Sequence, residues 1–574
     1  MRKLTALLLI LALVAGLVPV AFAKTYTLDI YWIANVNSDK VYRDIAESVC
    51  DSEGIARAAN EAISRYLDLD DIDDDGIRRG VREAVDGYIS RKVEEAVGEY
   101  LADENLRNAK IVKGVERAIN AYLAQLHDEK KIRDMQVSIH LVFWDPAWTE
   151  DAIGALMEDR KIDLIFTADW EGYVQEIEAD KLMELEDQLE NNGRGILETL
   201  SPDFLEGVRV NGHIYGIPTN KELCVPSGII VNKTAALEIG WDPDLNPVET
   251  TAELEPYLQA YKEKYPDRYP YLMEKDRWAD EPWGHEWIGL EEDVLSMKFA
   301  KDENGNYDET VYSIYETDEQ EEHIRLMYRW AGLGYISPDA ATQDYNAVFG
   351  TGEFLVFTQP LKGNNFKSIE MYAANKNPAV PDFECTEIVM QDKYKVTCQA
   401  GGSMFAIPRT GRADYAMQYL NLMHTDPVLV NLMLFGEEGV NYTKVNETQV
   451  EKIDDEHWWY GLHGGAWTVG NTKLQYVLTT EDPEKNAKLQ DYAQDAPMTA
   501  SYGFRFDKKK AETLEAVETV VRKFARPLMV GAVDPDDPEL GLEAFRAALH
   551  EAGIDALKAE VERQYEEWKI ANSK

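Results

Sequence analysis

Residues 25–33 read TYTLDIYWI, and two stretches of the same kind follow, QVSIHLVFW at 136–144 and KIDLIF at 161–166. In the first two, apolar side chains occupy every second position, which is the pattern of a β-strand with one buried face. The third is a short apolar run, and residues 151–160 between the last two have helical periodicity. Strands that alternate with helices form parallel βαβ units, so we predict an α/β fold.

The first 23 residues have the layout of a secretory signal peptide. Arg2 and Lys3 precede an apolar run from Leu4 to about Val18, and Ala21-Phe22-Ala23 places small residues where a signal peptidase cleaves. We therefore predict a secreted protein that begins at Lys24 and works at the cell surface or in the periplasm. An uncleaved membrane anchor is the alternative, although the run is short for a membrane span.

The composition limits the classes of partner. The chain has 105 acidic and 59 basic residues, for a formal net charge of -46. Such a surface repels phosphates, so we expect no nucleic-acid partner. With 574 residues, 45% of them apolar, we expect two or three domains with their own cores and a monomeric chain.

The segment 51–112 differs from its surroundings because it is charged and strongly helical. Similar residues open helix-like stretches at 54–58, 80–84 and 114–118. The unequal spacing does not predict a solenoid, so we interpret 51–112 as a helical insertion between the first two strands, with chance similarity as the alternative. Near the carboxyl terminus, two apolar stripes at helical spacing predict packing faces. They are formed by Leu514, Val517, Val521 and Phe524, and by Leu557, Val561, Tyr565 and Trp568.

Motifs for catalysis or metal binding do not emerge. Asp71, Asp73, Asp75 and Gly76 match the opening of a calcium loop, but Arg82 stands where the bidentate carboxylate belongs. Nucleophile elbows, zinc-binding helices and phosphate loops are absent from the sequence. We therefore predict no enzyme, no metal and no cofactor. The four cysteines form no disulfide scaffold, and whether Cys385 pairs with Cys398 stays open.

The aromatic residues are the most informative side chains. Several tryptophans lie beside polar residues in expected loops, and a flat ring beside carboxylates and amides suits the apolar face and hydroxyl edge of a sugar. Ligands of open α/β sheets bind at the carboxyl ends of the strands. The predicted ligand-binding residues are Trp32, Trp144, Asp145, Asp169, Trp170, Tyr173 and Asn220 in the first lobe, with Trp283 and Trp287 on a loop of the second. The alternative for each tryptophan is a half-buried core position.

The order of short segments resembles that of family 1 extracellular solute-binding proteins, the receptors of ABC importers. The resemblance rests on DLIFT at 163–167, NGHIYGIPTN at 211–220, GIIVNK at 228–233 and FGTGE at 349–353, followed by AIP at 406–408. A further set, GEEGVNY at 436–442, GFRFD at 503–507, VDP at 533–535 and Trp568, resembles an uncharacterised C-terminal domain found in a Firmicutes subset of these proteins.

The resemblance implies a periplasmic-binding-protein-like (type II) fold, in which two α/β lobes close on a ligand about a hinge. Lobe 1 is then expected at 24–220 and 400–435, lobe 2 at 225–395, and a mostly helical C-terminal domain at 436–574. The hinge crossings are expected near 220–228 and 395–402. The implied function is capture of an oligosaccharide-like ligand and its delivery to ABC permease subunits.

Two features depart from the resemblance. The family runs from its first strand directly into one helix, whereas this chain inserts the 51–112 segment. The nearest cysteine to the predicted cleavage site is Cys50, so the lipid-modified cysteine of Firmicutes members is absent. A peptide or other polar nutrient as ligand, a surface adhesion module, and a glycoside hydrolase or lyase remain the alternatives.

Overall fold

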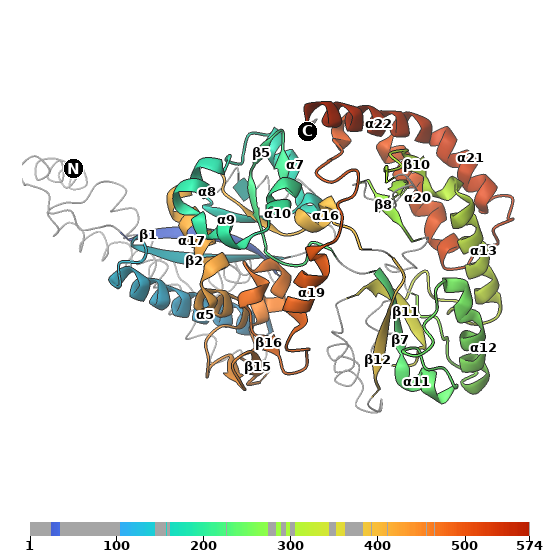
Figure 1. The fold of residues 1–574 in the computed structure, drawn as a ribbon, viewed down its shortest axis with the longest axis horizontal. Helices are drawn as coiled ribbons and strands as arrows, with labels where there is room; N and C mark the ends of the chain where they lie inside the picture. Colours follow the sequence, from blue (N-terminus) through green and yellow to red (C-terminus); the bar gives the residue numbers. More distant parts are fainter. Residues whose placement is uncertain are drawn as a thin grey trace, which may run out of the picture.

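The structure is a computed structural model, in which two α/β lobes lie side by side and a group of C-terminal helices lies above the second (Figure 1). It describes residues 25–34, 104–143, 156–157, 161–224, 227–273, 283–288, 294–298, 305–343, 352–361, 383–391, 393–409, 411–454, 456–463 and 465–572. The predicted signal peptide, most of the helical insertion and the candidate calcium loop lie outside these residues.

Lobe 1 is built on a five-stranded sheet with the order β2-β1-β3-β13-β6. The strands are β1 (Tyr26–Ala34), β2 (Met135–Phe143), β3 (Leu164–Thr167), β6 (Gly216–Pro218) and β13 (Met404–Ala406). β1 pairs in parallel with both β2 and β3, which confirms the predicted βαβ arrangement, whereas β13 is antiparallel to its neighbours. The carboxyl ends of β1, β2 and β3 therefore share one edge of the sheet.

Helix α5 (Glu104–Asp128) makes the connection from the insertion back to β2. Val112, Val115, Ile119 and Leu123 are buried at intervals of three and four residues, so one face of the helix packs on the sheet. Gly114 lies inside this helix and does not open it. Residues 114–118, the third copy of the proposed repeat, were expected to open a helix. They lie in the middle of α5 instead, because the apolar face of the helix continues through Gly114.

The buried Asp163 explains why a carboxylate precedes β3. Its side chain accepts hydrogen bonds from the Asp29 amide at 3.0 Å, the Tyr26 hydroxyl at 2.7 Å and the Arg412 amide at 2.9 Å. A buried carboxylate is tolerated when donors surround it. Asp163 thus ties β1 and the start of the α17 segment to β3.

The remaining faces of the lobe 1 sheet are covered by short helices. They are α7 (Tyr173–Glu178), α8 (Glu186–Asn192), α9 (Arg194–Thr199), α10 (Pro202–Gly207), α16 (Thr397–Ala400), α17 (Ala413–Thr425) and α18 (Pro427–Phe435). A two-stranded ribbon, β4 (Arg209–Val210) with β5 (His213–Ile214), precedes β6. The Asp426 side chain caps α18 by accepting from the amides of Val428 and Leu429, a contact typically worth about 1 kcal/mol.

Lobe 2 contains a smaller antiparallel sheet with the order β11-β7-β12. Its strands are β7 (Ser227–Asn232), β11 (Val356–Pro360) and β12 (Cys385–Val389), and its helices are α11 (Lys233–Glu238), α12 (Glu255–Lys264) and α13 (Asp318–Gly332). A second antiparallel sheet, β10-β9-β8, consists of β8 (His285–Trp287), β9 (Leu295–Lys298) and β10 (Tyr312–Ser313). Between the described lobe 2 strands the pairing is thus antiparallel, and a single parallel bridge joins Tyr271 to Val356 of β11.

The segment 436–574, expected as one C-terminal domain, is divided between two cores. Trp459, Val469 and Tyr502 belong to the lobe 1 core, and this part carries β14 (Tyr442–Lys444), β15 (Gln449–Lys452), β16 (Val477–Leu478) and α19 (Lys485–Gln494). From Phe504 onward the buried apolar side chains, apart from Val530, join a different core, together with residues of β8–β10 and α13. We call residues 504–571 the C-terminal module.

The C-terminal module contains α20 (Leu514–Met529), α21 (Leu542–Ala552) and α22 (Ile554–Ala571). The first predicted apolar stripe is confirmed, because Val517, Val521 and Phe524 are buried. The second is confirmed by the burial of Leu557, Val561 and Tyr565, with Trp568 packed against them.

The chain crosses between the lobes three times within the described residues. It leaves lobe 1 between β6 and β7, returns between β12 and β13, and leaves again between Tyr502 and Phe504. The second and third crossings run side by side, because the Lys395 amide donates to the Pro497 carbonyl at 2.8 Å and the Thr499 amide donates to the Lys395 carbonyl at 3.1 Å. Only two crossings were expected from the sequence.

Cys385 and Cys398 are not joined by a disulfide. Cys385 lies in β12 of the lobe 2 sheet, whereas Cys398 lies in α16, which packs against α10 of lobe 1. The two cysteines are close in sequence, but the second crossing lies between them and places them in different lobes. None of the described helices is long and apolar enough to cross a membrane.

Candidate functional site

The turn after β3 is the first element of the site. The one-turn helix η1 (Asp169–Glu171) starts directly beyond the carboxyl end of the strand, and the Asp169 amide donates to the Gly401 carbonyl at 2.8 Å. Gly172 has φ +78° and so allows the chain to reverse into α7. This geometry presents Asp169 and Trp170 at the edge of the sheet where ligands of α/β folds bind.

Trp170 presents an aromatic face to solvent. Its side chain is 43% exposed, although its Nε1 donates to the Gly402 carbonyl at 2.9 Å. Its ring is tilted by 49° against that of Trp467, with 6.2 Å between the ring centroids. The hydrogen bond and the neighbouring ring fix the orientation of Trp170, so the solvent-exposed part of its side chain is a preformed surface for an apolar ligand face.

Asp169 is held by Arg505 from the C-terminal module. The two nitrogens Nε and Nη2 of Arg505 donate to the two carboxylate oxygens, at 2.6 and 3.0 Å. Arg505 also donates to the carbonyls of Gly207 at 2.6 Å and Arg209 at 3.3 Å. This bidentate pair neutralises both charges inside the protein, so Asp169 is already paired before any ligand arrives.

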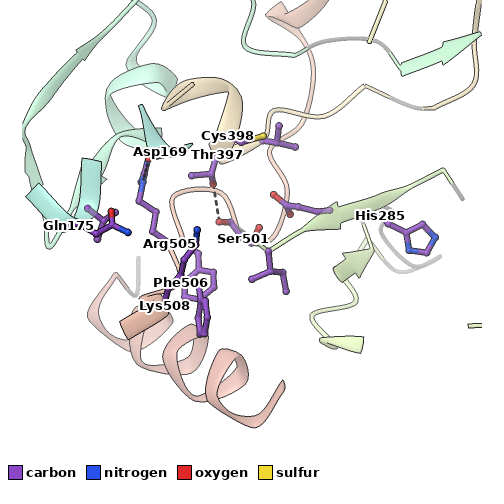
Figure 2. Close-up of a pocket in the computed structure, with 14 residues that line it drawn as sticks. Asp169, Gln175, His285, Thr397, Cys398, Ser501, Arg505, Phe506 and Lys508 are labelled. Atoms are coloured by element: carbon purple, nitrogen blue, oxygen red, sulfur yellow. Dashed lines mark hydrogen bonds and ion pairs between the residues drawn. The ribbon is translucent and has the colours of Figure 1, made fainter. Parts of the chain in front are cut away.

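Beside this ion pair lies a pocket of about 180 Å³ at the junction of four parts of the chain. Figure 2 shows Arg505 reaching toward Asp169 on one side, with His285 on the far side. Lobe 1 contributes Asp169, Val174 and Gln175; the second crossing contributes Val396, Thr397 and Cys398; the β8 region contributes His285, Glu286 and Ile288; and the C-terminal part contributes Ser501, Phe504, Arg505, Phe506 and Lys508.

The pocket walls carry few unpaired charges at neutral pH. Burial raises the pKa of Glu286 to about 7, although hydrogen bonds from Ser501 and Thr499 oppose the shift. Burial, together with the positive charge of Lys298, lowers the pKa of His285 to about 4, so its ring is neutral at pH 7. Hydroxyl groups, a carboxyl group that is only partly ionised and phenylalanine rings together suit a neutral polar ligand.

Three predicted site residues of lobe 1 are enclosed by protein. The Trp32 Nε1 donates to Thr468 Oγ1 at 3.0 Å and the Tyr173 hydroxyl donates to the Val208 carbonyl at 2.9 Å; both side chains lie in the lobe 1 core. Asn220 is also buried, and its Nδ2 donates to the Thr199 carbonyl at 2.9 Å. In this conformation the three side chains are buried in lobe 1 and are not exposed to a ligand.

The remaining predicted residues lie in two places. Trp287 ends strand β8, so it lies in a sheet and not on the expected loop; Trp283 precedes the same strand. The Trp283 Nε1 is buried and finds no hydrogen-bond partner among the described residues. Trp144 and Asp145 lie outside the described residues. The structure therefore brings Asp169 into one pocket with His285 and Glu286 of β8, the strand that follows Trp283.

Sequence reasoning missed Arg505, Glu286 and Trp467. Arg505 stands between two phenylalanines in GFRFD, and an arginine inside an apolar stretch signals a buried ion pair. Glu286 lies between the two predicted residues Trp283 and Trp287, but it was not itself predicted. Among the described residues no cluster of three or more metal-ligating side chains is found.

Two family models match the chain. Residues 119–436, more than half of the chain, match the bacterial extracellular solute-binding protein family. Residues 500–570 match a domain of unknown function, DUF3502. The second match coincides closely with the C-terminal module, and the segment between the two matches contains Trp467.

Similar proteins are found among curated sequences and solved structures. A carbohydrate ABC transporter substrate-binding protein of Streptococcus pneumoniae is 25% identical over 69% of this chain and 78% of its own length. The N-glycan transport solute binding protein (NgtS) of the same species has a similar fold, with a TM-score of 0.68 at 18% identity over 96% of this chain and 100% of that chain. Its complex with Man5GlcNAc gives a TM-score of 0.58 at 19% identity, over 81% and 96% of the two chains.

Proposed function

Because the chain belongs to the bacterial extracellular solute-binding proteins, we propose that it captures an oligosaccharide outside the cell and delivers it to the membrane subunits of an ABC transporter. The curated relative is a carbohydrate receptor of this kind, and NgtS is solved with an N-glycan fragment. In this proposal the protein is a secreted monomer that changes conformation without catalysing a reaction.

The observation that carries the proposal is the pocket at the junction of the lobes, which is lined by Asp169, the sequence neighbour of the exposed Trp170. One wall comes from lobe 1 and the opposite wall from β8 and the C-terminal module. A ligand that contacts both walls binds the closed arrangement more tightly than any open one. It therefore shifts the population toward the closed form, which is the form the transporter is proposed to recognise.

A ligand screen tests the class of solute. Thermal unfolding is followed with a panel of neutral oligosaccharides, including Man5GlcNAc, with acidic oligosaccharides and with peptides. A ligand present at a hundred times its Kd stabilises the native state by about 2.7 kcal/mol, which raises Tm measurably. We expect stabilisation by neutral oligosaccharides. Stabilisation by peptides alone contradicts the proposed ligand class, and release of reducing ends from the sugars contradicts a purely binding role.

Replacement of Trp170 tests the site. The substitution Trp170→Ala removes the exposed ring and is expected to weaken binding of the stabilising oligosaccharide about tenfold or more, with little loss of stability. Tyr269→Ala is the matched control, because Tyr269 is an aromatic residue of similar exposure in lobe 2, away from the pocket. Isothermal titration calorimetry measures both variants. Unchanged affinity in Trp170→Ala removes Trp170 from the site.

A further inference from the structure

The C-terminal module is firmly attached to lobe 2. Its apolar face shares one core with β8–β10 and α13, through residues such as Phe524, Phe545 and Ile324. Around this core, ion pairs join Arg546 to Glu321 at 2.9 Å and Arg325 to Asp536 at 2.9 Å. Apolar packing and paired charges thus hold the module against the α13 helix over much of its length.

Helix α13 connects this core to the lobe 2 sheet. Ile324 belongs to the core of the module, whereas Met327 and Trp330, one and two turns later, belong to the core beneath β7, β11 and β12. Val530, which directly follows α20, is buried in that lobe 2 core as well. Because packed cores transmit displacement with little compression, the module and lobe 2 are expected to move as one body.

Contacts between the module and lobe 1 are of a different kind. The Arg505 side chain is only 9% exposed and forms the bidentate pair with Asp169 described above. Next to it, Lys509 forms an exposed ion pair with Glu178 at 3.4 Å. An exposed pair contributes little to stability, whereas loss of one partner from an enclosed pair is strongly destabilising. The Arg505–Asp169 pair is therefore the dominant polar connection across this boundary.

We infer that the domain of unknown function at 500–570 is part of the ligand-binding machinery: it extends lobe 2 as one rigid body, lines the interlobe pocket, and uses Arg505 to position the Asp169–Trp170 turn of lobe 1. Phe504 and Phe506, on either side of Arg505, line the same pocket. Arg505 is a positioning residue in this arrangement, because it acts on the ligand surface through Asp169. The link to ligand capture rests on the proposed function, whereas the mechanical arrangement does not.

Distances between spin labels test the arrangement without a ligand. Exposed positions serve for the labels: Leu197→Cys on α9 of lobe 1, Leu237→Cys on α11 of lobe 2, and Ile570→Cys on α22 of the module. The labels are introduced in pairs into a background with Cys50→Ser and Cys398→Ser, since Cys224 and Cys385 are buried. Double electron–electron resonance then gives the three distance distributions of the full chain.

If the inference is correct, the three distance distributions respond differently to the loss of Arg505. In the otherwise unchanged chain, the 237–570 distribution is narrow. Arg505→Gln widens the 197–570 and 197–237 distributions together and leaves 237–570 unchanged. Arg505→Lys, which keeps one charged donor, gives intermediate widths. Lys509→Gln is the matched control across the same boundary, and it leaves all three distributions unchanged.

Two results overturn the inference. If 237–570 widens as much as 197–570, the module is not part of the lobe 2 body. If neither Arg505→Gln nor Asp169→Asn changes the 197–570 distribution, the ion pair does not hold the boundary. Asp169→Asn keeps the size of the side chain and is the second variant in case Arg505→Gln folds poorly. Because these distances are measured without ligand, a failed ligand screen affects the proposed function alone.

Discussion

Glu286 shows how a single buried carboxyl group sets the charge of the pocket. Its Oε1 accepts a hydrogen bond from the Thr499 hydroxyl at 2.9 Å, and the surrounding protein leaves it almost no contact with water. Burial disfavours the ionised form, so the pKa rises to about 7. Near neutral pH the wall of the pocket therefore contains a carboxyl group that is protonated, and so uncharged, in about half of the population.

This carboxyl group predicts a pH-dependent stability. A pKa raised from 4.5 to about 7 on folding means that the contribution of Glu286 is fully present below about pH 4.5 and is lost as the pH rises through about 7. The substitution Glu286→Gln removes this pH-dependent loss of stability, because glutamine does not ionise. We expect the variant to gain stability relative to the wild type between about pH 5 and pH 8, on the order of 3 kcal/mol in total.

Chemical denaturation at a series of pH values measures the effect. Glu322→Gln on the exposed face of α13 is the control, because its side chain is open to solvent. The two unfolding free energies of Glu286→Gln and wild type should diverge with pH, whereas those of Glu322→Gln and wild type should run parallel. A constant difference for Glu286→Gln contradicts the raised pKa.

Trp32 packs inside the lobe 1 core, so its replacement is expected to lower stability and not ligand affinity, the opposite of what is expected for Trp170. Trp32→Phe removes the hydrogen bond to Thr468 and leaves a small void in the lobe 1 core. We expect a loss of about 1–3 kcal/mol of stability with unchanged affinity for the ligand that stabilises the wild type. Denaturant titration and calorimetric binding measure the two quantities. If the variant binds the ligand more weakly under conditions in which it is fully folded, Trp32 belongs to the ligand site.

At the scale of residues, the sequence predicted correctly that Trp170 follows a strand, because that position depends only on local pattern; its role in ligand binding stays a prediction. The turn at 169–170 follows a strand whose pattern is visible in DLIFT. The partner of Asp169 was not predictable in the same way, since Arg505 lies 336 positions later. Long-range pairing depends on topology, which local periodicity does not contain.

At the scale of elements, the contact between α20 and α13 depends on Gly531. This residue has φ +72°, and a Cβ atom there would lie 2.3 Å from the Met327 carbonyl oxygen. Gly531→Ala is therefore expected to destabilise the protein by more than the roughly 1–3 kcal/mol of a strained backbone alone. Gly212→Ala is the control, because Gly212 has φ +85° with no atom within 4 Å of the added Cβ.

Denaturant unfolding of the two glycine variants separates strain from collision. We expect Gly531→Ala to lose about 2 kcal/mol more than Gly212→Ala, since only the former also meets a backbone atom. Equal losses for the two variants contradict close packing between α20 and α13. The same contact is the one that makes the module part of lobe 2.

Elements with a strong pattern were the ones that the sequence predicted correctly. β1, β2 and the stripes of α20 and α22 each show several repeats of their period. Trp287 was expected on a loop, yet it ends the three-residue strand β8. A strand of this length contains too little alternation to be detected, and it forms because β9 pairs with it.

At the scale of the whole molecule, the described residues form two separable bodies. One core contains lobe 1 together with residues up to Tyr502, and the others contain lobe 2 and the C-terminal module. Contiguous cores tend to unfold as cooperative units. We expect differential scanning calorimetry of the ligand-free protein to show two transitions.

The two core variants identify these transitions. Trp32→Phe should lower only the transition of lobe 1, and Gly531→Ala only that of lobe 2 with the module. Each substitution lies inside one body, so its cost falls on that body when unfolding is not fully coupled. A single transition that both variants lower equally contradicts the division into two bodies.

The division of residues 436–574 is what the sequence could not predict. The motifs at 436–442, 503–507 and 533–535 resemble one appended domain, and the helical stripes after 514 agree with that expectation. The structure instead gives residues up to Tyr502 to lobe 1, because Trp459 and Val469 fill its core. Which body an apolar segment joins is decided by shape complementarity in three dimensions, and hydrophobic patterning does not report it.

The number of crossings has a practical consequence. Because the number of crossings is odd, the described chain begins and ends on different bodies. Its first strand, β1, lies in lobe 1, and its last helix, α22, lies in the C-terminal module attached to lobe 2 (Figure 1). With two crossings both would lie on the same body. Fluorophores attached near the start of β1 and the end of α22 would therefore report relative motion of the two bodies through energy transfer. The chain is laid out for conversion into an optical biosensor of its own solute, with no need to insert a reporter inside either lobe.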